Sequence, residues 1–170
     1  AAHCVASMSP RNLDIVLGRH RLSSTDGERI RAAQIIIHPF FDEQTKDADL
    51  ALVRLSQGSV QTPVVLYTWR QDETSLNFLQ ATISGWGRYF VESDATSDTL
   101  REVQVPIVAK DVCNQPDALN GQVTRNMFCT GYERGGKGAC TGRGQADFSQ
   151  HRIQRLPLVP RDSPRILLEP

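Results

Sequence analysis

The sequence predicts an all-β fold, because its regular segments are short, rich in β-branched residues and closed by glycine or proline. Residues 13–18 alternate between inward and outward apolar positions and end on Gly18, which is typical of a strand that leads into a turn. Residues 33–42 contain an Ile-Ile-Ile run that stops at Pro39, as a buried strand does. Residues 100–108 alternate with period two and indicate an amphipathic strand.

Length and charge limit the classes of protein that the chain can represent. A chain of 170 residues is long enough for one domain with a substantial core. Its 19 basic residues balance 19 acidic residues, so net charge gives no basis for a nucleic acid, an acidic substrate or an anionic membrane as partner. No apolar run approaches the roughly 18 residues of a membrane-spanning helix, and no signal peptide opens the chain. We predict no nucleic-acid partner and no membrane partner.

Polar segments separate the predicted strands. Residues 19–27 and 91–99 are polar and are interpreted as loops, and no internal repeat is present. His38 is followed by Pro39 at the end of an apolar run, so we interpret it as a structural residue rather than a catalytic one.

The character of the chain changes after residue 142. Residues 143–170 hold four of the chain's nine prolines, and their short apolar patches at 156–160 and 166–168 are too brief and too interrupted for a stable helix. We predict that this segment is disordered. We interpret it as non-native sequence from a shifted reading frame or an alternative exon junction, with an arginine- and proline-rich interaction segment as the alternative.

The four cysteines are Cys4, Cys113, Cys129 and Cys140. An even number permits two disulfides in three connectivities, and the residues alone do not choose among them. Free buried cysteines in an intracellular protein are the alternative.

Four short motifs occur in a fixed order along the chain. They are Ala-Ala-His-Cys at 1–4, Asp-Leu-Ala-Leu at 49–52, Gly-Trp-Gly at 85–87 and Met-Phe-Cys-Thr-Gly-Tyr at 127–132. With the glycine-rich loop 135–144, they resemble the chymotrypsin/trypsin-like serine protease family over residues 1–142. The resemblance implies two antiparallel six-stranded Greek-key β-barrels of the trypsin-like fold, both incomplete here. Residues 1–66 would form the first barrel, 67–142 part of the second, and 143–170 a divergent, disordered tail.

The resemblance implies a serine endopeptidase that hydrolyses peptide bonds with a His-Asp-Ser triad. His3 matches the general base, and Asp49 matches the carboxylate that orients it. Gly144 stands where the family has the nucleophilic serine, and Arg143 stands where it has an aspartate. We therefore expect the chain, which also looks like a fragment truncated at its N-terminus, to be inactive itself. The alternative is a non-catalytic homologue that acts as a binding or regulatory protein.

The remaining predicted site residues lie in the glycine-rich loop 135–144. The resemblance places the oxyanion hole at the backbone N–H groups of Gly142 and Gly144. It places Gly138 at the base of the specificity pocket, where the absence of a carboxylate favours apolar substrate side chains. Ser149 and Ser163 lack flanking glycines, so we do not expect either to replace the nucleophile. No cofactor and no metal are predicted: Arg19 occupies the start of the family's calcium loop, where an acidic residue is usual.

In the family pattern, Cys113 and Cys129 are disulfide partners, whereas the partners of Cys4 and Cys140 would lie outside the matched segment. The resemblance also implies a secreted, extracellular protein that meets protein or peptide substrates and protease inhibitors. Because strands are missing at both ends of the matched region, we expect open sheet edges and exposed apolar faces. We predict a protein that is either monomeric or prone to aggregate.

Overall fold

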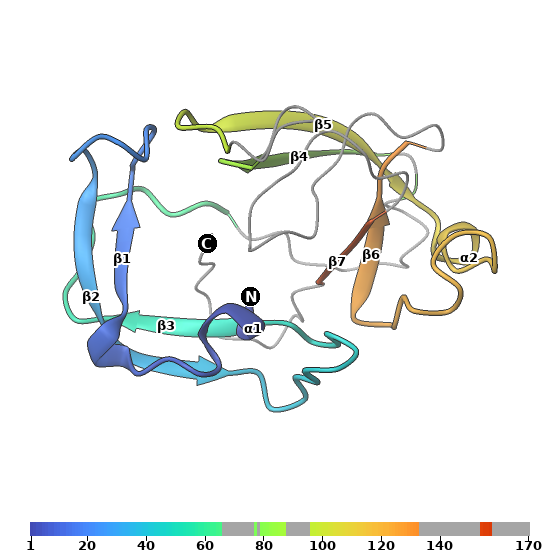
Figure 1. The fold of residues 1–170 in the computed structure, drawn as a ribbon, viewed down its shortest axis with the longest axis horizontal. Coiled ribbons are helices and arrows are strands. Elements are labelled where there is room, and N and C mark those ends of the chain that lie inside the picture. Colours follow the sequence, from blue (N-terminus) through green and yellow to red (C-terminus); the bar gives the residue numbers. More distant parts are fainter. Residues whose placement is uncertain (66–76, 78, 88–95, 133–153, 158–170) are drawn as a thin grey trace. The chain divides into compact units, whose positions relative to one another are not determined.

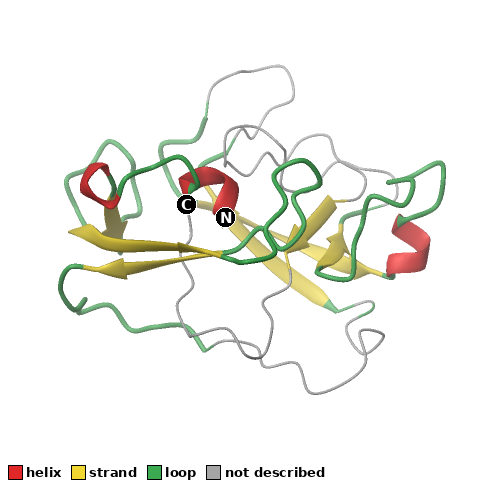
Figure 2. Cartoon of the chain, turned by 90° about the horizontal axis from the view of Figure 1, so that it is seen from below, coloured by secondary structure: helices red, strands yellow, loops and turns green. Residues whose placement is uncertain are grey.

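A computed structural model describes residues 1–65, 77, 79–87, 96–132 and 154–157. Strands dominate it and the helices are single turns, which confirms the predicted all-β class (Figures 1 and 2). The described residues fall into two compact units, with residues 1–65 in the first and the others in the second. None of the described helices is long and apolar enough to cross a membrane.

The first unit contains a three-stranded antiparallel sheet in the order β1-β2-β3. The elements are α1 (Ala2–Val5), a 3₁₀ turn (Pro10–Asn12), β1 (Asp14–Leu17), β2 (Glu28–Ile37) and β3 (Ala51–Leu55). Strands were predicted within 13–18 and from residue 33, and both predictions are confirmed. β2 begins earlier than predicted because its polar first half, which carries two arginines on its outer face, pairs with β1.

A β-bulge in β2 decides which side chains face the core. Ile30 and Ala32 are buried, and the pairing with β3 then shifts register between Ala32 and Gln34. One extra residue reverses the alternation of faces along a strand. Beyond the bulge Ile35 is therefore half-buried, whereas Ile36 is exposed. The bulge keeps apolar residues inward at both ends of a long strand.

A glycine and a carboxylate close the loop between β1 and β2. Gly27 has φ +92°, and a Cβ at this position would lie 2.6 Å from the backbone oxygen of Leu17. Glu28, the next residue, accepts hydrogen bonds from Ser59 Oγ at 2.6 Å and from the backbone N–H of Val60 at 3.1 Å. Only glycine combines this backbone conformation with so close an approach, and Glu28 ties the segment after β3 to the start of β2.

The second unit contains a four-stranded antiparallel sheet in the order β4-β5-β6-β7. Its elements are β4 (Gln80–Gly85), β5 (Arg101–Val108), α2 (Lys110–Cys113), β6 (Met127–Thr130) and β7 (Gln154–Pro157). The predicted strand at 100–108 is confirmed as β5.

A disulfide anchors the core of the second unit. It joins Cys113 at the end of α2 to Cys129 in β6, and both residues are fully buried. This confirms the pairing that the family pattern implied. The sulfur atoms lie in a small apolar cluster that also contains Val108, Leu119, Val123 and Met127.

The long loop between α2 and β6 is closed by one amide side chain. Asn114 donates from Nδ2 to the backbone oxygen of Val123 at 2.8 Å and accepts from the N–H of Val123 at 2.9 Å. Asn120 and Gly121, with φ of 45° and 75°, turn the chain between these two points. The loop thus returns to the disulfide without regular secondary structure.

β7 was not predicted. It pairs with β6 from Thr130↔Gln154 to Met127↔Pro157, and it comes from the proline- and arginine-rich segment that we expected to be disordered. Proline has no N–H to donate, so Pro157 suits the last position of a ladder at the edge of a sheet. The remainder of the predicted tail, 143–153 and 158–170, lies outside the described residues.

Candidate active site

His3 lies on the single turn of α1, at the start of the first unit. The turn closes with a backbone hydrogen bond of 2.8 Å from Ala6 N–H to the oxygen of Ala2, and Ala2 is fully buried. Ala2 is fully buried, whereas 39% of the His3 side chain is exposed. The histidine is therefore held by the backbone but open to small molecules.

Asp49 lies just before β3, at the end of the loop that follows β2. The residue before it, buried Ala48, adopts a left-handed backbone with φ 48°. The N–H of Leu50 donates to the oxygen of Ala48 at 2.7 Å, and the oxygen of Leu50 accepts from the N–H of His38 at 2.9 Å. This tight turn directs the Asp49 side chain out of the line of the strand.

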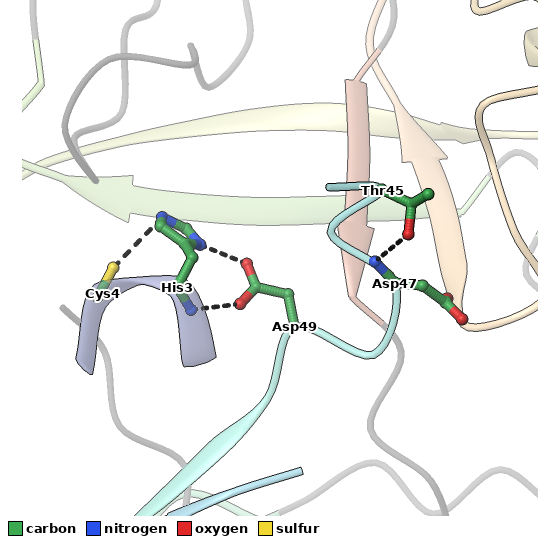
Figure 3. A network of polar contacts seen from close by, with 5 residues as sticks. All are labelled: His3, Cys4, Thr45, Asp47 and Asp49. Atoms are coloured by element: carbon green, nitrogen blue, oxygen red, sulfur yellow. Dashed lines mark hydrogen bonds and ion pairs between the residues drawn. The ribbon is translucent and has the colours of Figure 1, made fainter. Parts of the chain in front are cut away.

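The loop itself is organised by a second aspartate. Asp42 Oδ1 accepts the backbone N–H groups of Gln44 and Thr45, each at 2.8 Å. These bonds, that from Thr45 first, lower the pKa of the Asp42 carboxyl group because they stabilise its charged form. Asp47 N–H in turn donates to Thr45 Oγ1 at 3.3 Å (Figure 3). From Asp42 to Asp49 the loop thus holds its shape without glycine or proline.

The Asp49 carboxylate binds His3 at two points (Figure 3). Its Oδ1 accepts the backbone N–H of His3 at 2.8 Å, and its Oδ2 lies 2.5 Å from His3 Nδ1. Only 10% of the Asp49 side chain is exposed. Two contacts from one carboxylate fix both the position of the residue and the orientation of the ring. The structure thus brings into contact the two residues, 46 positions apart, that the resemblance had paired.

The free side of the ring faces a thiol. His3 Nε2, the nitrogen that does not contact Asp49, lies 3.4 Å from Cys4 Sγ. Cys4 is half-buried and is the free cysteine among the described residues. An imidazole held through Nδ1 by a carboxylate can accept and return a proton at Nε2, which is the chemistry of a general base.

The structure describes only some of the other residues that the sequence analysis singled out. Gly138, Gly142 and Gly144, together with Cys140, lie outside the described residues. His38, interpreted as structural, accepts the backbone N–H of Phe40 at Nδ1 over 3.3 Å, and their rings lie 5.9 Å apart. Its ring is used in the turn that ends β2.

Within the described part of the chain, no group of three or more His, Cys, Asp or Glu side chains could hold a metal ion. In the loop between β1 and β2, Arg19 Nε donates to the backbone oxygen of Asp26 at 2.9 Å. Glu28 at the end of this loop is occupied by Ser59 and Val60. The contact of Arg19 thus lies within the loop, whereas those of Glu28 tie the end of the loop to the segment after β3.

Sequence reasoning missed two parts of the site. The contact between Cys4 and His3 was not foreseen, because the resemblance assigned Cys4 to a partner before residue 1. The hydrogen bonds that Asp42 accepts from Gln44 and Thr45 were also not foreseen, although an aspartate that follows a strand and precedes polar residues is a known turn signal. Such a signal predicts a turn at Asp42 but does not predict that the turn leads to Asp49.

Comparisons with known proteins identify the family of this chain. A family model described as Trypsin matches residues 1–143. Trypsin-3 of Salmo salar is 32% identical over 144 residues, which cover 84% of this chain and 58% of the relative. Trypsin eta of Drosophila melanogaster is 34% identical over 149 residues, covering 84% of this chain and 54% of the relative.

A third relative has a longer chain. Mannan-binding lectin serine protease 1 of Homo sapiens is 34% identical over 138 residues, which cover 79% of this chain but 20% of the relative. The chain thus spans a little over half the length of the two trypsins and a fifth of this protease. The family match covers all the described strands except β7, and it includes both His3 and Asp49, which we call the dyad. This chain belongs to the trypsin family.

Proposed function

We propose that His3 and Asp49 are the general base and the orienting carboxylate of a serine endopeptidase site. The observation that carries the proposal is the double contact between the Asp49 carboxylate and His3. A carboxylate that only stabilised a turn would need one of these contacts. The second contact, to Nδ1, selects the ring orientation that a base requires.

The roles follow from the two ring nitrogens. His3 Nε2 would remove the proton from a serine hydroxyl as it attacks the substrate carbonyl, and would return that proton to the leaving amine. Asp49 would hold the tautomer that carries the proton on Nδ1 and would stabilise the imidazolium that forms. Substrates of this class are proteins or peptides, which are also the partners that we propose, together with protein inhibitors of such enzymes.

We further propose that the chain as given does not complete this reaction. Gly144, at the position of the nucleophile in the family pattern, has no side chain, and loss of a triad nucleophile costs about 10⁶-fold in turnover. Arg143 brings a cation to a position where the family has an anion, beside the predicted oxyanion donors Gly142 and Gly144. Each such donor contributes about 3 kcal/mol to the barrier, so their disturbance adds to the loss. Gly138 gives the proposed pocket no carboxylate for a basic substrate side chain.

The disulfide supports an extracellular location. The bond between Cys113 and Cys129 needs an oxidising compartment to persist, and we propose secretion on this basis. Exposed apolar side chains on the first unit, Phe40, Val60, Val64 and Val65, support the proposal that the isolated chain is prone to aggregate.

The dyad can be tested by proton NMR of the whole chain. A proton shared between His3 Nδ1 and Asp49 Oδ2 should exchange slowly and give a resonance well downfield of the amide protons. Asp49→Ala and His3→Gln should each abolish this resonance, whereas His20→Gln should leave it in place. A folded parent chain without the resonance, or a resonance that survives Asp49→Ala, would contradict the assignment of the dyad.

The missing nucleophile needs a separate test. The chain should form no covalent adduct with a fluorophosphonate serine-hydrolase probe and should cleave no peptide amide, with Salmo salar trypsin as the positive control. An adduct on Ser149 or Ser163 would show that another serine serves as nucleophile. The transcript across the codons for residues 141–146 should also be sequenced. A one-base shift that restores Asp-Ser-Gly-Gly-Pro would identify the natural product as an active protease that uses His3 and Asp49.

A further inference from the structure

We propose that the outer face of the sheet in the first unit docks an extended acidic segment of a partner protein. The surface, which we call the arginine face, consists of the outward side chains Arg29, Arg31, Arg54, Ile36 and Leu52. It contains neither His3 nor Asp49, so the proposal does not rest on the proposed proteolytic site. It concerns a protein that the chain holds and leaves open which bond, if any, the chain cleaves.

The alternation of β2 places Arg29 and Arg31 on the outer face. They flank Ile30, which is 1% exposed, whereas 60% and 65% of their own side chains are exposed. Successive side chains of a strand point to opposite faces, so these two point to the same side and their Cα atoms are about 7 Å apart. β2 is the central strand of the described sheet, so the two charges do not serve to protect a sheet edge from pairing.

β3 continues the same face beyond the bulge. Val53 is fully buried, so its neighbours in sequence, Leu52 and Arg54, point outward. Arg54 stands opposite Gln34 of β2. Leu52 stands opposite Ile36, which is 44% exposed. Residues directly opposite each other in an antiparallel pair share a face. From the start of β2 to its end, the face thus presents three arginines and then an apolar pair.

Two of the arginines share one carboxylate. Asp14 Oδ2 lies 3.3 Å from Arg29 Nη1, and Asp14 Oδ1 lies 3.4 Å from Arg31 Nε. Each contact uses one of the five N–H donors of a guanidinium group. Among the described residues no ion pair engages Arg54, which is exposed. Three arginines against one aspartate leave a net charge of +2, and like charges gathered on one face of a sheet favour a partner of opposite charge.

The chemistry of the arginine face selects an acidic peptide. A planar guanidinium group binds a carboxylate through two parallel N–H···O bonds. Acidic side chains at alternate positions of an extended peptide repeat at the spacing of about 7 Å that separates Arg29 and Arg31. The apolar pair Ile36 and Leu52 at the end of the row matches an aliphatic side chain and not a sulfated sugar. We therefore assign the face to a protein partner and not to an anionic polysaccharide.

The binding test uses the full chain and the fluorescein-labelled peptide Glu-Thr-Glu-Thr-Glu-Thr-Leu, followed by fluorescence anisotropy. A control peptide with glutamine in place of each glutamate keeps the length and removes the charge. In low salt the acidic peptide should bind at least about tenfold more tightly than the control, and added salt should reduce this difference because it screens exposed charges. Equal binding of the two peptides would overturn the proposal. Binding of a heparin fragment without binding of the acidic peptide would also overturn it.

Variants test whether the arginines bind the peptide. The triple variant Arg29→Gln, Arg31→Gln, Arg54→Gln should bind the acidic peptide no better than the parent binds the control peptide. Arg125→Gln, which removes an exposed arginine of the second unit, should change the affinity by less than about twofold. Asp14→Asn removes the carboxylate that competes with the peptide and should tighten binding about threefold. An unchanged affinity in the triple variant, or weaker binding by folded Asp14→Asn, would overturn the proposal.

The parent chain also allows a test that needs no variant. The amide resonances of β1, β2 and β3 should shift as the acidic peptide is added, and those of Arg29, Arg31 and Arg54 should be among them. The control peptide should leave these resonances in place. Shifts confined to the second unit would overturn the proposal, because the peptide would then bind elsewhere on the chain.

Discussion

In the first unit a carboxylate and a left-handed turn hold His3 in place, whereas in the second unit a disulfide ties α2 to β6. The first arrangement depends on hydrogen bonds to Asp49 and on the loop before it, which Asp42 and Ala48 shape. The second depends on a covalent bond within a fully buried apolar cluster. Both units are antiparallel sheets of similar size, so the sheet alone does not explain how each is stabilised.

The difference teaches where each unit can be damaged. Hydrogen bonds to a carboxylate are weakened when the charge of the carboxylate is removed, and they are broken when the backbone of the turn changes. A disulfide fails on reduction and resists changes of charge. The contacts that position His3 in the first unit are of the first kind, whereas the bond that ties α2 to β6 in the second unit is of the second kind.

The largest expected effect breaks the second unit. Replacing both Cys113 and Cys129 by alanine removes a cross-link across a sequence separation of 16 residues. The free energy of unfolding should fall by about 3 kcal/mol, mainly because the unfolded chain gains conformational freedom. Amide hydrogen exchange should accelerate in β5 and β6, while the protection of β2 and β3 and the downfield His3 resonance should persist. Equal loss of protection in both sheets would show that the comparison between the units is wrong.

The next largest effect is a loss of stability in the first unit, caused by a change at a glycine of its backbone. Gly27→Ala places a Cβ about 2.6 Å from the oxygen of Leu17 in a left-handed conformation. The left-handed backbone alone costs about 1–2 kcal/mol for a residue with a Cβ, and displacement of the Leu17 carbonyl adds to this. We expect a loss of about 2–3 kcal/mol in urea unfolding, with the faster exchange in β1 and β2.

Two other glycines serve as matched controls for Gly27. Gly121 has φ +75° but open space around its Cβ position, so Gly121→Ala should cost only the backbone term. Gly58 has neither feature, and Gly58→Ala should change stability by less than about 1 kcal/mol in either direction. Equal losses for all three variants would show that the contact with Leu17 has no effect.

The smallest effect concerns pH, and it tests whether the charged carboxylate of Asp42 stabilises the first unit. The pKa of Asp42 is lowered in the folded chain by the N–H groups of Thr45 and Gln44. Its stabilising contribution is therefore complete above the unfolded pKa of about 3.9 and is lost as pH falls through the lower folded value. Asp42→Asn, which keeps an acceptor oxygen, should melt at a temperature that varies less between about pH 5 and pH 2.

Asp42→Ala provides the complementary variant, because it removes the acceptor as well as the charge. It should lower the melting temperature at every pH, and its exchange should accelerate in loop 42–48. If Asp42→Asn and the parent chain lose stability in parallel as pH falls, the hydrogen bonds to Thr45 and Gln44 do not contribute to the acid response.

The strands could be predicted from the sequence where the pattern of apolar residues is local. Residues 14–17 and 101–108 follow such a pattern, and both are strands. The bulge at residue 33 could not be predicted, because it arises from pairing with β3 and not from any glycine or proline in β2. Lys46 and Ala48 have positive φ although neither residue type signals a turn. The conformation of the loop before Asp49 therefore could not be predicted either.

The candidate site was predicted for a different reason. No local pattern brings His3 to Asp49 across 46 positions, and it was the resemblance to a protease family that paired them. The same resemblance hid the contact between Cys4 and His3, because it assigned the thiol to a partner elsewhere. A family pattern therefore identifies the residues of a shared site but not the contacts that are particular to one chain.

β7 has a consequence for how a sheet of this kind tolerates a change of sequence. The family match ends at residue 143, yet residues 154–157 form a strand along the edge of β6. Strand pairing is made by hydrogen bonds of the main chain, so it depends little on which side chains the added strand carries. A segment that lies beyond the family match can thus extend a sheet whose other strands lie within that match.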